Sequence, residues 1–496
     1  FMDVLGMNSD GTFVDNEIAL GDIVRSAPTK DIFAGLIEEF IANGYQENMD
    51  LFVLPYDWRL DIRTTSIILK DKIDAVKNQT GASKADIVAH SMGGLLAKQY
   101  ALDNGSSSID KLIFVGTPHL GAPKAAKTLL LGDDLGISII IPFLDFQRIK
   151  YISQNMPGIY QLLPSNEYFS QIGNYYGELN GINYDYSRMR QYLIDSGLNL
   201  TLINGANDFH TVAIDSFDAN GIDVYNITGC TTPTISSITK RTDFNNEYTL
   251  QMSAGDGTVP FGSSKAINID SNKSYYFKNH GFLNSLFPRI DHSELPSASG
   301  IKELILDIIT GGSISLPEYT TQNPAECKLE GEIVSVHSPV NLHIYDSSGN
   351  HVGRGENGEI DYNITGVAYE EIGENKFVFL PTSGGQTYQI ELDGTGVGTY
   401  SLRVSRIEDN EVVETAYYSD LPVNTSTEAT VTLADSVSNT VLQVDQNGTG
   451  SFVQESISAV LDSAAAADVT QPSSTITVSG GQTQAYVSLS ATDDNA

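Results

Sequence analysis

The segment AHSMGG, Ala89–Gly94, restricts the possible folds of this chain more than any other part of its sequence. The residues before it predict a strand, Lys84–Ser91, and the residues after it predict a helix, Gly93–Leu102. Small residues on both sides of Ser91 allow the strand and the helix to meet closely at a strained turn, which exposes the hydroxyl at the strand end. The helix N-terminus favours negative charge at the same place. The pattern predicts a nucleophilic serine, although such a segment standing alone also fits a buried loop serine.

Helical and strand patterns alternate through the first three hundred residues around this motif. Strand–helix–strand units at this spacing are typical of parallel strands joined by right-handed crossovers. We therefore expect an α/β sheet with helices on both faces. The further expected helices are Thr29–Tyr45, Thr64–Gly81 and Gly300–Gly312, and the further expected strands are Met49–Arg59, Lys111–Pro118, Leu198–Gly205, Val224–Gly229, Tyr248–Pro260 and Ser274–Asn279.

Residues 124–197 interrupt this alternation. The stretch is rich in Tyr, Ile, Leu and Asn and predicts helices without strands between them. We expect a helical cap or lid over Ser91, with the apolar run Ile137–Leu144 near the opening, because a soluble enzyme must cover an apolar pocket until substrate arrives. An insertion that packs far from the site is the alternative.

The helical period disappears after Gly312. Residues 316–461 alternate apolar and polar positions between Gly, Asn and Asp turns, which predicts an all-β sandwich. We expect residues 1–312 to form the α/β domain, with the boundary between Ile309 and Glu318. Residues 462–496 predict a linker and the start of a second, immunoglobulin-like module. Both ends of the chain lie inside patterned sequence, so we expect a fragment.

Charge and composition exclude several classes of protein. The net charge is −34, which argues against binding to nucleic acid or to an anionic membrane surface by charge. Residues 1–310 hold 23 Lys and Arg against 36 Asp and Glu (23 − 36 = −13), and residues 311–496 hold 5 against 26 (5 − 26 = −21). No run reaches the roughly 18 apolar residues of a membrane-spanning helix.

Two cysteines, Cys230 and Cys327, are too few for a cysteine-rich zinc module or a disulfide framework. They can pair once, and the sequence does not decide whether they do. No metal-binding or dinucleotide-binding motif is present, so we expect neither a metal nor a cofactor.

A nucleophilic serine requires a base and an acid that orients the base. In a fold of this kind the chain order is serine, acid, histidine. Asp256 follows the expected strand Tyr248–Met252, and His292 lies just before the last helix, where the base is usually found. His280 is the alternative base, and His210 is a more distant candidate.

The oxyanion of an acyl-transfer intermediate requires two backbone donors. The amide of Met92, directly after the serine, is the first. We expect the second on a loop upstream of residue 1, which predicts weak activity for this fragment.

Five short motifs in the first three hundred residues identify a known family. They are NGY (Asn43–Tyr45), LPYDWRLD (Leu54–Asp61), AHSMGG, GTPHLGAPKA (Gly116–Ala125) and GDGTVP (Gly255–Pro260). By these motifs, residues 40–310 resemble the lecithin:cholesterol acyltransferase family of α/β-hydrolases, which includes phospholipid:diacylglycerol acyltransferases and lysosomal phospholipases. The resemblance implies a triad of Ser91, Asp256 and His292. We interpret Asp57 and Arg59 as a structural charge pair.

We therefore expect a lipid ester hydrolase or O-acyltransferase that works through an acyl-enzyme at Ser91, with water or an alcohol as acceptor and transient lipid contact through the lid. Two alternatives remain at this point. One is a non-catalytic or weakly active extracellular protein whose β modules mediate binding, and the other is an esterase on small soluble esters. The acidic composition and few cysteines indicate a secreted or cell-surface protein.

Overall fold

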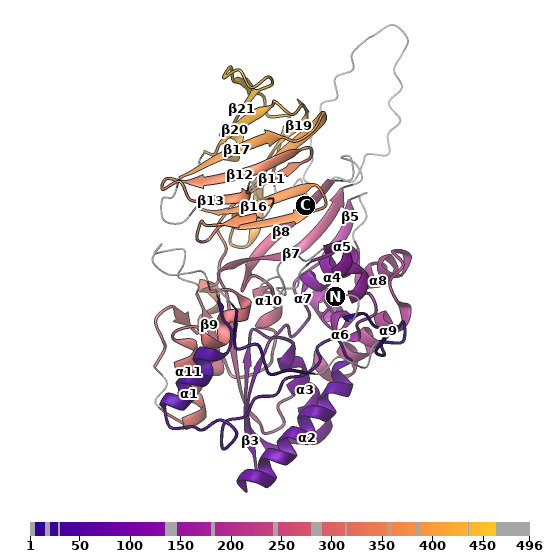
Figure 1. The fold of residues 1–496 in the computed structure, drawn as a ribbon, viewed down its shortest axis with the longest axis vertical. Coiled ribbons are helices and arrows are strands. Elements are labelled where there is room, and N and C mark those ends of the chain that lie inside the picture. Colours follow the sequence, from indigo (N-terminus) through magenta and orange to yellow (C-terminus); the bar gives the residue numbers. More distant parts are fainter. Residues whose placement is uncertain are drawn as a thin grey trace, which may run out of the picture.

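The computed structural model describes residues 5–14, 20–27, 30–133, 146–179, 184–241, 247–278, 290–312, 315–355, 358, 360–382, 387–434 and 436–462. Figure 1 shows an α/β unit (residues 5–321) below a β-sandwich unit (residues 331–462), with strands β7 and β8 rising between the two. The expected run Ile137–Leu144, the candidate base His280 and the expected second module after residue 462 lie outside the described residues.

The sheet of the α/β unit has five strands among the described residues, in the order β10-β9-β6-β4-β3. The first four strands along the chain are parallel neighbours, and β10 pairs antiparallel with β9 at the edge. The predicted parallel sheet is therefore confirmed. The strands are β3 (Ala85–His90), β4 (Ile109–Val115), β6 (Asp223–Gly229), β9 (Ser274–Phe277) and β10 (Thr320–Thr321).

Helices cover both faces of this sheet because alternate side chains of a strand point to opposite faces. In β4, Leu112 and Phe114 pack in a cluster with α2 (Ile62–Thr80) and α3 (Met92–Asn104). Ile113 and Val115 pack instead with α1 (Ala34–Ala42) and α11 (Ile301–Thr310).

The described part of residues 124–197 is mostly helical, as expected, but it also contains one short strand, β5 (Tyr176–Leu179). Other helices of the α/β unit are α4 (Pro123–Leu130), α5 (Phe146–Ser153), α6 (Pro157–Tyr160), α7 (Asn166–Gln171), α8 (Tyr186–Asp195), α9 (Leu200–Phe209) and α10 (Phe261–Ser264). Near the N-terminus, two strands of two residues each, β1 (Ser26–Ala27) and β2 (Lys30–Asp31), pair antiparallel.

Two of the predicted strands are wrong. Leu198–Gly205 lies largely in the helix α9, because the side chain of Asn199 caps the amides of Thr201 and Leu202 and the apolar residues then follow a helical face. Met49–Arg59 forms only an isolated bridge at Leu51.

The expected strand Tyr248–Pro260 exists as β8 (Glu247–Gly255), but it is not part of the parallel sheet. It pairs antiparallel with β7 (Thr232–Arg241) in a separate sheet whose order is β5-β7-β8 among the described strands. This hairpin leaves the α/β unit and reaches the β-sandwich unit (Figure 1).

Two antiparallel sheets form the β-sandwich unit and enclose a core of Val, Leu, Ile and Tyr side chains. One sheet contains β15 (Ala368–Ile372), β16 (Asn375–Pro381), β11 (Gly331–His337), β18 (Gly398–Glu408), β19 (Glu411–Val423) and β23 (Ala459–Asp462), in that order. The other contains β14 (Ile360–Tyr362), β13 (His351–Arg354), β12 (Val340–Asp346), β17 (Tyr388–Gly394), β20 (Glu428–Thr432), β21 (Val441–Asp445) and β22 (Val453–Glu455).

Part of the first of these sheets is buried on both faces. Its outer face contributes Ile333, Phe377 and Phe379 to a cluster that also contains Ile238 and Leu250 of the β7–β8 hairpin. All seven residues of β11 are buried for this reason. The two units therefore share one continuous apolar core.

A disulfide and a buried ion pair add to this interface. Cys230, directly after β6, is bonded to Cys327, 97 residues later in the sequence. The ammonium of Lys127 on α4 lies 2.6 Å from a carboxylate oxygen of Glu370 on β15 and 2.7 Å from one of Asp133. Burial opposes the charge, but the two carboxylates hold the pKa of Lys127 above its ordinary value.

The chain between the units stays with the parallel sheet longer than we expected. Thr320 and Thr321 pair with β9, and the strands of the sandwich begin only at Gly331. Within the described part of the chain, no helix combines the length and the apolar character that a membrane crossing requires.

Candidate active site

Ser91 occupies the turn between β3 and α3. Its backbone has φ 55° and ψ −130°, a strained conformation for a residue with a side chain. The amide of Ser91 donates a hydrogen bond of 2.9 Å to the carbonyl of Val115 at the end of β4. The strain is therefore held by the neighbouring strand, and the hydroxyl stands beyond the strand ends.

Gly94 is required at this turn for a specific contact. A methyl group on Gly94 would lie 2.0 Å from the hydroxyl oxygen of Thr117, which follows β4. The first turn of α3 can therefore approach the end of β4 only where residue 94 lacks a side chain.

The structure brings Ser91, His292 and Asp256 together. The Nε2 atom of His292 lies 2.7 Å from Ser91 Oγ, and its Nδ1 atom lies 2.8 Å from Asp256 Oδ2. Because a carboxylate accepts only, the ring proton is on Nδ1, and Nε2 accepts from the serine hydroxyl. Asp256 is 2% exposed. This is the geometry that a serine nucleophile with an oriented base requires.

The turn after β8 holds the carboxylate of Asp256. Its Oδ1 atom accepts hydrogen bonds from the amides of Thr258 (3.0 Å) and Val259 (2.7 Å). Oδ2 is thereby left for the ring of His292. The sequence placed Asp256 after a strand but did not predict which groups bind each of its two carboxylate oxygens.

Two glycines that the sequence analysis did not single out make room for the acid and the base. A methyl group on Gly229, the last residue of β6, would lie 2.7 Å from Asp256 Cβ. One on Gly116, which has φ 59°, would lie 3.2 Å from Asp256 Oδ2 and 3.3 Å from His292 Cε1. The available signal was that Gly116 follows β4 directly and Gly229 ends β6, so both lie at the strand ends where Asp256 and His292 were expected.

His292 begins a 3-10 helix, His292–Ser297, just before α11. Asp291 caps it by accepting from the amide of Ser293 (3.0 Å), and Lys30 forms an ion pair with Asp291. The cap fixes the backbone from which the imidazole extends.

His90 contacts the base from the other side. Its Nε2 donates a hydrogen bond of 2.8 Å to the backbone carbonyl of His292, and the two rings lie 4.7 Å apart. Burial, and secondarily the neighbouring His292, lowers the pKa of His90 to about 3. His90 is therefore neutral at ordinary pH, and it ties the end of β3 to the loop that carries His292.

The amide of Met92 is the candidate oxyanion donor. Met92 is the first residue of α3, and the first amides of a helix have no acceptor within the helix. The second donor, which we expected before residue 1, lies outside the described residues.

The other residues that the sequence analysis singled out have different surroundings. Asp57 and Arg59 form a bidentate ion pair with distances of 2.6 and 2.9 Å, and Arg59 is 3% exposed and donates to the carbonyl of Leu5. His210 is buried between Asp215 (2.7 Å) and the carbonyl of Gln161 (2.9 Å).

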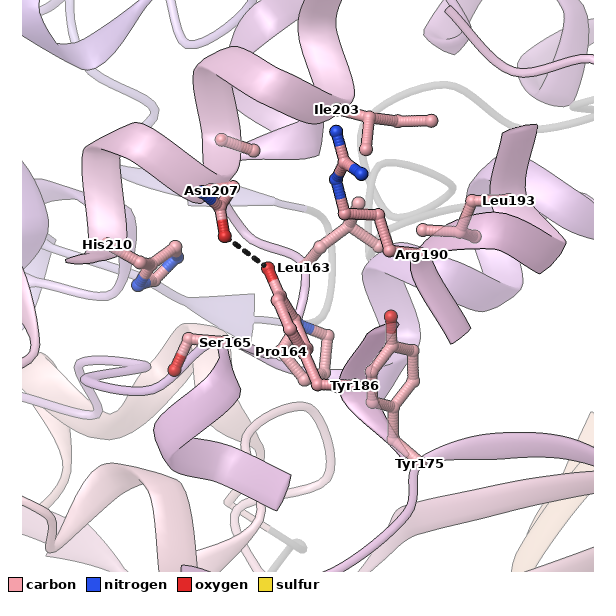
Figure 2. A pocket seen from close by; sticks show the side chains of 11 residues that line it. Leu163, Pro164, Ser165, Tyr175, Tyr186, Arg190, Leu193, Ile203, Asn207 and His210 are labelled. Carbon is pink, nitrogen blue, oxygen red and sulfur yellow. Dashed lines mark hydrogen bonds between the residues drawn. The ribbon is translucent and has the colours of Figure 1, made fainter. Parts of the chain in front are cut away.

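Figure 2 shows a small cavity between the segment 163–165 and the helices α8 and α9, with His210 on its wall. Its volume is about 20 Å³, enough for one water molecule. Ser91, Asp256 and His292 do not line it, so this cavity is separate from the candidate active site.

A parallel sheet with helices on both faces, a serine at a strand–helix turn, and an acid and a histidine at the same end of the sheet define the class of α/β-hydrolases. The sequence model of the lecithin:cholesterol acyltransferase family matches residues 21–204. Over these residues the chain is similar to this family.

Several individual proteins match parts of this chain. A phospholipase A(1) of Arabidopsis thaliana is 27% identical over 143 residues, which are 27% of this chain and 32% of that relative. The phosphatidylcholine-sterol acyltransferase of Rattus norvegicus is 27% identical over 243 residues, which are 46% of this chain and 52% of that relative. The chain thus spans from about a third to about half of the length of these relatives. Among solved structures, a Bacillus licheniformis lipase in its propeptide form matches with a TM-score of 0.31 and 13% identity, covering 85% of this chain and 91% of that chain.

Proposed function

We propose that this chain is a serine-dependent lipid ester hydrolase or O-acyltransferase that works through an acyl-enzyme at Ser91. The observation that carries the proposal is the line of hydrogen bonds from Ser91 Oγ through His292 to Asp256, at 2.7 and 2.8 Å. The match of residues 21–204 to the lecithin:cholesterol acyltransferase family model, and the similarity to a phospholipase A(1) and a phosphatidylcholine-sterol acyltransferase, support a lipid ester as substrate.

In the first half of the reaction, Ser91 Oγ attacks the acyl carbon while its proton passes to His292 Nε2. Asp256 stabilises the imidazolium through Nδ1, and the amide of Met92 donates to the oxyanion. His292 then gives the proton to the leaving alkoxide, and the acyl group stays on Ser91 as an ester.

In the second half, the oxygen of water or of an alcohol attacks this ester and His292 takes its proton. The Ser91–acyl bond breaks, and His292 returns the proton to Ser91 Oγ. Water yields a free acid, and an alcohol yields a new ester.

We also propose that the inserted helices cover the site. A methyl group on Gly158 in α6 would lie 2.1 Å from the carbonyl oxygen of Trp58 and 2.8 Å from the side chain of Met92. This contact brings the insertion against the residue next to the nucleophile, which supports a cap over Ser91 that contacts lipid during substrate entry.

The disulfide Cys230–Cys327 supports a secreted or cell-surface location, because structural disulfides persist mainly in oxidising compartments. Reduced thiols at both positions in protein isolated from its natural host would contradict this part of the proposal.

The proposal is tested with a fluorophosphonate probe that reacts with activated serines, together with p-nitrophenyl butyrate, p-nitrophenyl palmitate and phosphatidylcholine vesicles as substrates. We expect labelling and ester hydrolysis by the wild type, a preference for the long-chain substrates, and loss of both activities in Ser91→Ala. The control is Ser107→Ala, which removes an exposed hydroxyl outside the site.

Adding a long-chain alcohol distinguishes hydrolysis from transfer, because only transfer yields a new ester. Equal labelling of the wild type and Ser91→Ala would contradict the acyl-enzyme. A clear preference for the butyrate ester would favour an esterase on small soluble substrates.

A further inference from the structure

The strand that presents the candidate acid is an edge strand. Within the described sheet β5-β7-β8, β8 has a neighbour on one side only, and Asp256 follows its last residue. The outward amides of an edge strand need other partners when they are buried, because a buried amide without a partner destabilises the fold. Ala254, two residues before Asp256, is 1% exposed. The hydrogen-bond partner of the Ala254 amide therefore influences the position of Asp256.

The partner comes from the β-sandwich unit. The amide of Ala254 donates a hydrogen bond of 2.9 Å to the side-chain oxygen of Asn410. Asn410 lies in the turn between β18 and β19 with φ 76°, a left-handed conformation that Asn adopts more readily than most residues.

The other bonds of Asn410 determine the orientation of its amide. Oδ1 also accepts from the amide of Leu329 (3.0 Å), and Nδ2 donates to the carbonyl of Cys327 (3.3 Å). The backbone amide of Asn410 donates to the carbonyl of Leu329 (3.2 Å). A flipped side chain would set its NH2 group against two N–H donors, so only one orientation satisfies all the partners.

A disulfide connects a second neighbour of Asp256 to the same segment. Cys327 is bonded to Cys230, and Cys230 follows Gly229, the residue that lies directly against Asp256 Cβ. Asp256 is thus held between Ala254 and Gly229. Both of these residues connect through Asn410 and the disulfide to the same short segment, residues 327–329.

The parallel sheet does not hold Asp256 by itself. Ser91 lies on a strand end of that sheet, whereas Asp256 lies on a hairpin that belongs to a different sheet. The local bonds of Asp256 to Thr258 and Val259 orient the carboxylate within its own turn. They do not fix the distance between that turn and His292.

We propose that Asn410 is a positioning residue for the triad and that the β-sandwich unit, through this side chain, holds Asp256 at its distance from His292. The inference rests on the proposed function, because it assigns Asn410 a role in the reaction at Ser91. It makes the sandwich a part of the catalytic unit rather than only an attachment module.

The test compares Asn410→Gly with Asp409→Gly in the full chain. Glycine at position 410 removes the side-chain bonds and tolerates the positive φ. Asp409 is a matched control, because it has φ 51° in the same turn and its side chain is 66% exposed and paired with Lys328. With p-nitrophenyl butyrate, we expect kcat to fall about tenfold or more in Asn410→Gly, with little change in KM. Asp409→Gly should keep the wild-type kcat.

Asn410→Asp is the conservative variant, since it keeps the acceptor for Ala254 and loses the donor to Cys327. We expect an intermediate kcat. We also expect the pH at which kcat/KM falls to half on the acid side to change in Asn410→Gly, which a purely structural role would not produce.

The two proposals fail in different ways. If the wild type shows no Ser91-dependent labelling or hydrolysis, the proposed function is wrong. If the wild type is active and Asn410→Gly matches Asp409→Gly in kcat and in pH profile, the role of Asn410 is wrong. If Asn410→Gly does not fold, Asn410→Asp decides in the same way, and a wild-type kcat and pH profile in that variant would overturn the inference.

Discussion

The α/β unit and the β-sandwich unit are stabilised in different ways. In the α/β unit each strand of a parallel sheet is covered by helices that precede or follow it along the chain, and Ser91 lies at a turn between two such neighbours. In the β-sandwich unit the pairing is antiparallel, and one sheet is covered on its outer face by the other unit. Asp256 follows the β7–β8 hairpin, which contacts both the α/β unit and the β-sandwich unit.

The difference in charge between the two parts of the chain does not coincide with a division of the site. Residues 311–496 carry a net charge of −21 and residues 1–310 carry −13. The border between them nevertheless contains a buried Lys127–Glu370 ion pair, a disulfide and a shared apolar core. The predictions below test whether the acid depends on both units.

The largest expected effect is on catalysis by Asp256→Asn. We expect kcat to fall by about 10⁴-fold, because an amide no longer holds the ring of His292 in the required tautomer. The measurement is kcat with p-nitrophenyl butyrate. Asp215→Asn is the matched control, since Asp215 also bonds a buried histidine, His210, outside the site. An equal loss of kcat in both variants would contradict the assignment of the acid.

The second expected effect is on stability. Removing both cysteines with Cys230→Ser and Cys327→Ser releases a loop of 97 residues. A loop of about this length corresponds to about 4.7 kcal/mol of unfolding free energy in the chain-entropy model. Urea unfolding followed by the fluorescence of Trp58, the single tryptophan, reports on the α/β unit. An unchanged midpoint would show that the apolar interface alone holds the two units together.

The third expected effect is on catalysis, through Gly229, which lies against Asp256. Gly229→Ala places a methyl group 2.7 Å from Asp256 Cβ, so the acid must move. We expect kcat to fall by about 10²-fold, the loss expected for a displacement of about 1 Å. Gly21→Ala is the control, because no atom lies within 4 Å of a methyl group there. A wild-type kcat in Gly229→Ala would mean that the hairpin adjusts freely.

The smallest expected effect separates two buried lysines. Lys98 in α3 is 1% exposed, and burial lowers its pKa to about 7, although Asp215 partly opposes this. Between about pH 7 and about pH 10 the unfolded chain binds the extra proton, so the unfolding free energy rises with pH by up to about 1.4 kcal/mol per pH unit. Lys98→Met should remove this slope in urea unfolding.

Lys127→Met is the control for that experiment. The folded-state pKa of Lys127 is raised, so both states are protonated in this pH range and the substitution should leave the slope unchanged. A slope that persists in Lys98→Met would assign it to another group.

Local signals predicted much of the α/β unit. The expected helix Thr64–Gly81 matches α2, because Asp61 caps its first turn and Gly81, with φ 73°, ends it. Such caps are encoded within a few residues and do not depend on distant parts of the chain. The chain order of serine, acid and histidine likewise singled out three residues that the structure brings within hydrogen-bond distance.

Structural features that depend on residues far apart in the sequence were not predicted. Leu198–Gly205 has an apolar pattern that fits a strand. The segment forms the helix α9 instead, because its apolar face packs against other helices. β8 was recognised as a strand, but nothing near it in the sequence shows that it pairs with β7 outside the parallel sheet.

The strand–Ser91–helix turn, the helix caps and the alternation of the sandwich strands follow from local sequence, because they depend on neighbouring residues. The pairing of Cys230 with Cys327, the burial of β11 on both faces and the contact of Asn410 with Ala254 arise instead from the packing of the whole chain. These features join residues about 100 or more positions apart, or pack whole sheets together. Such contacts form only where the complete core brings the partners together, so no local pattern records them.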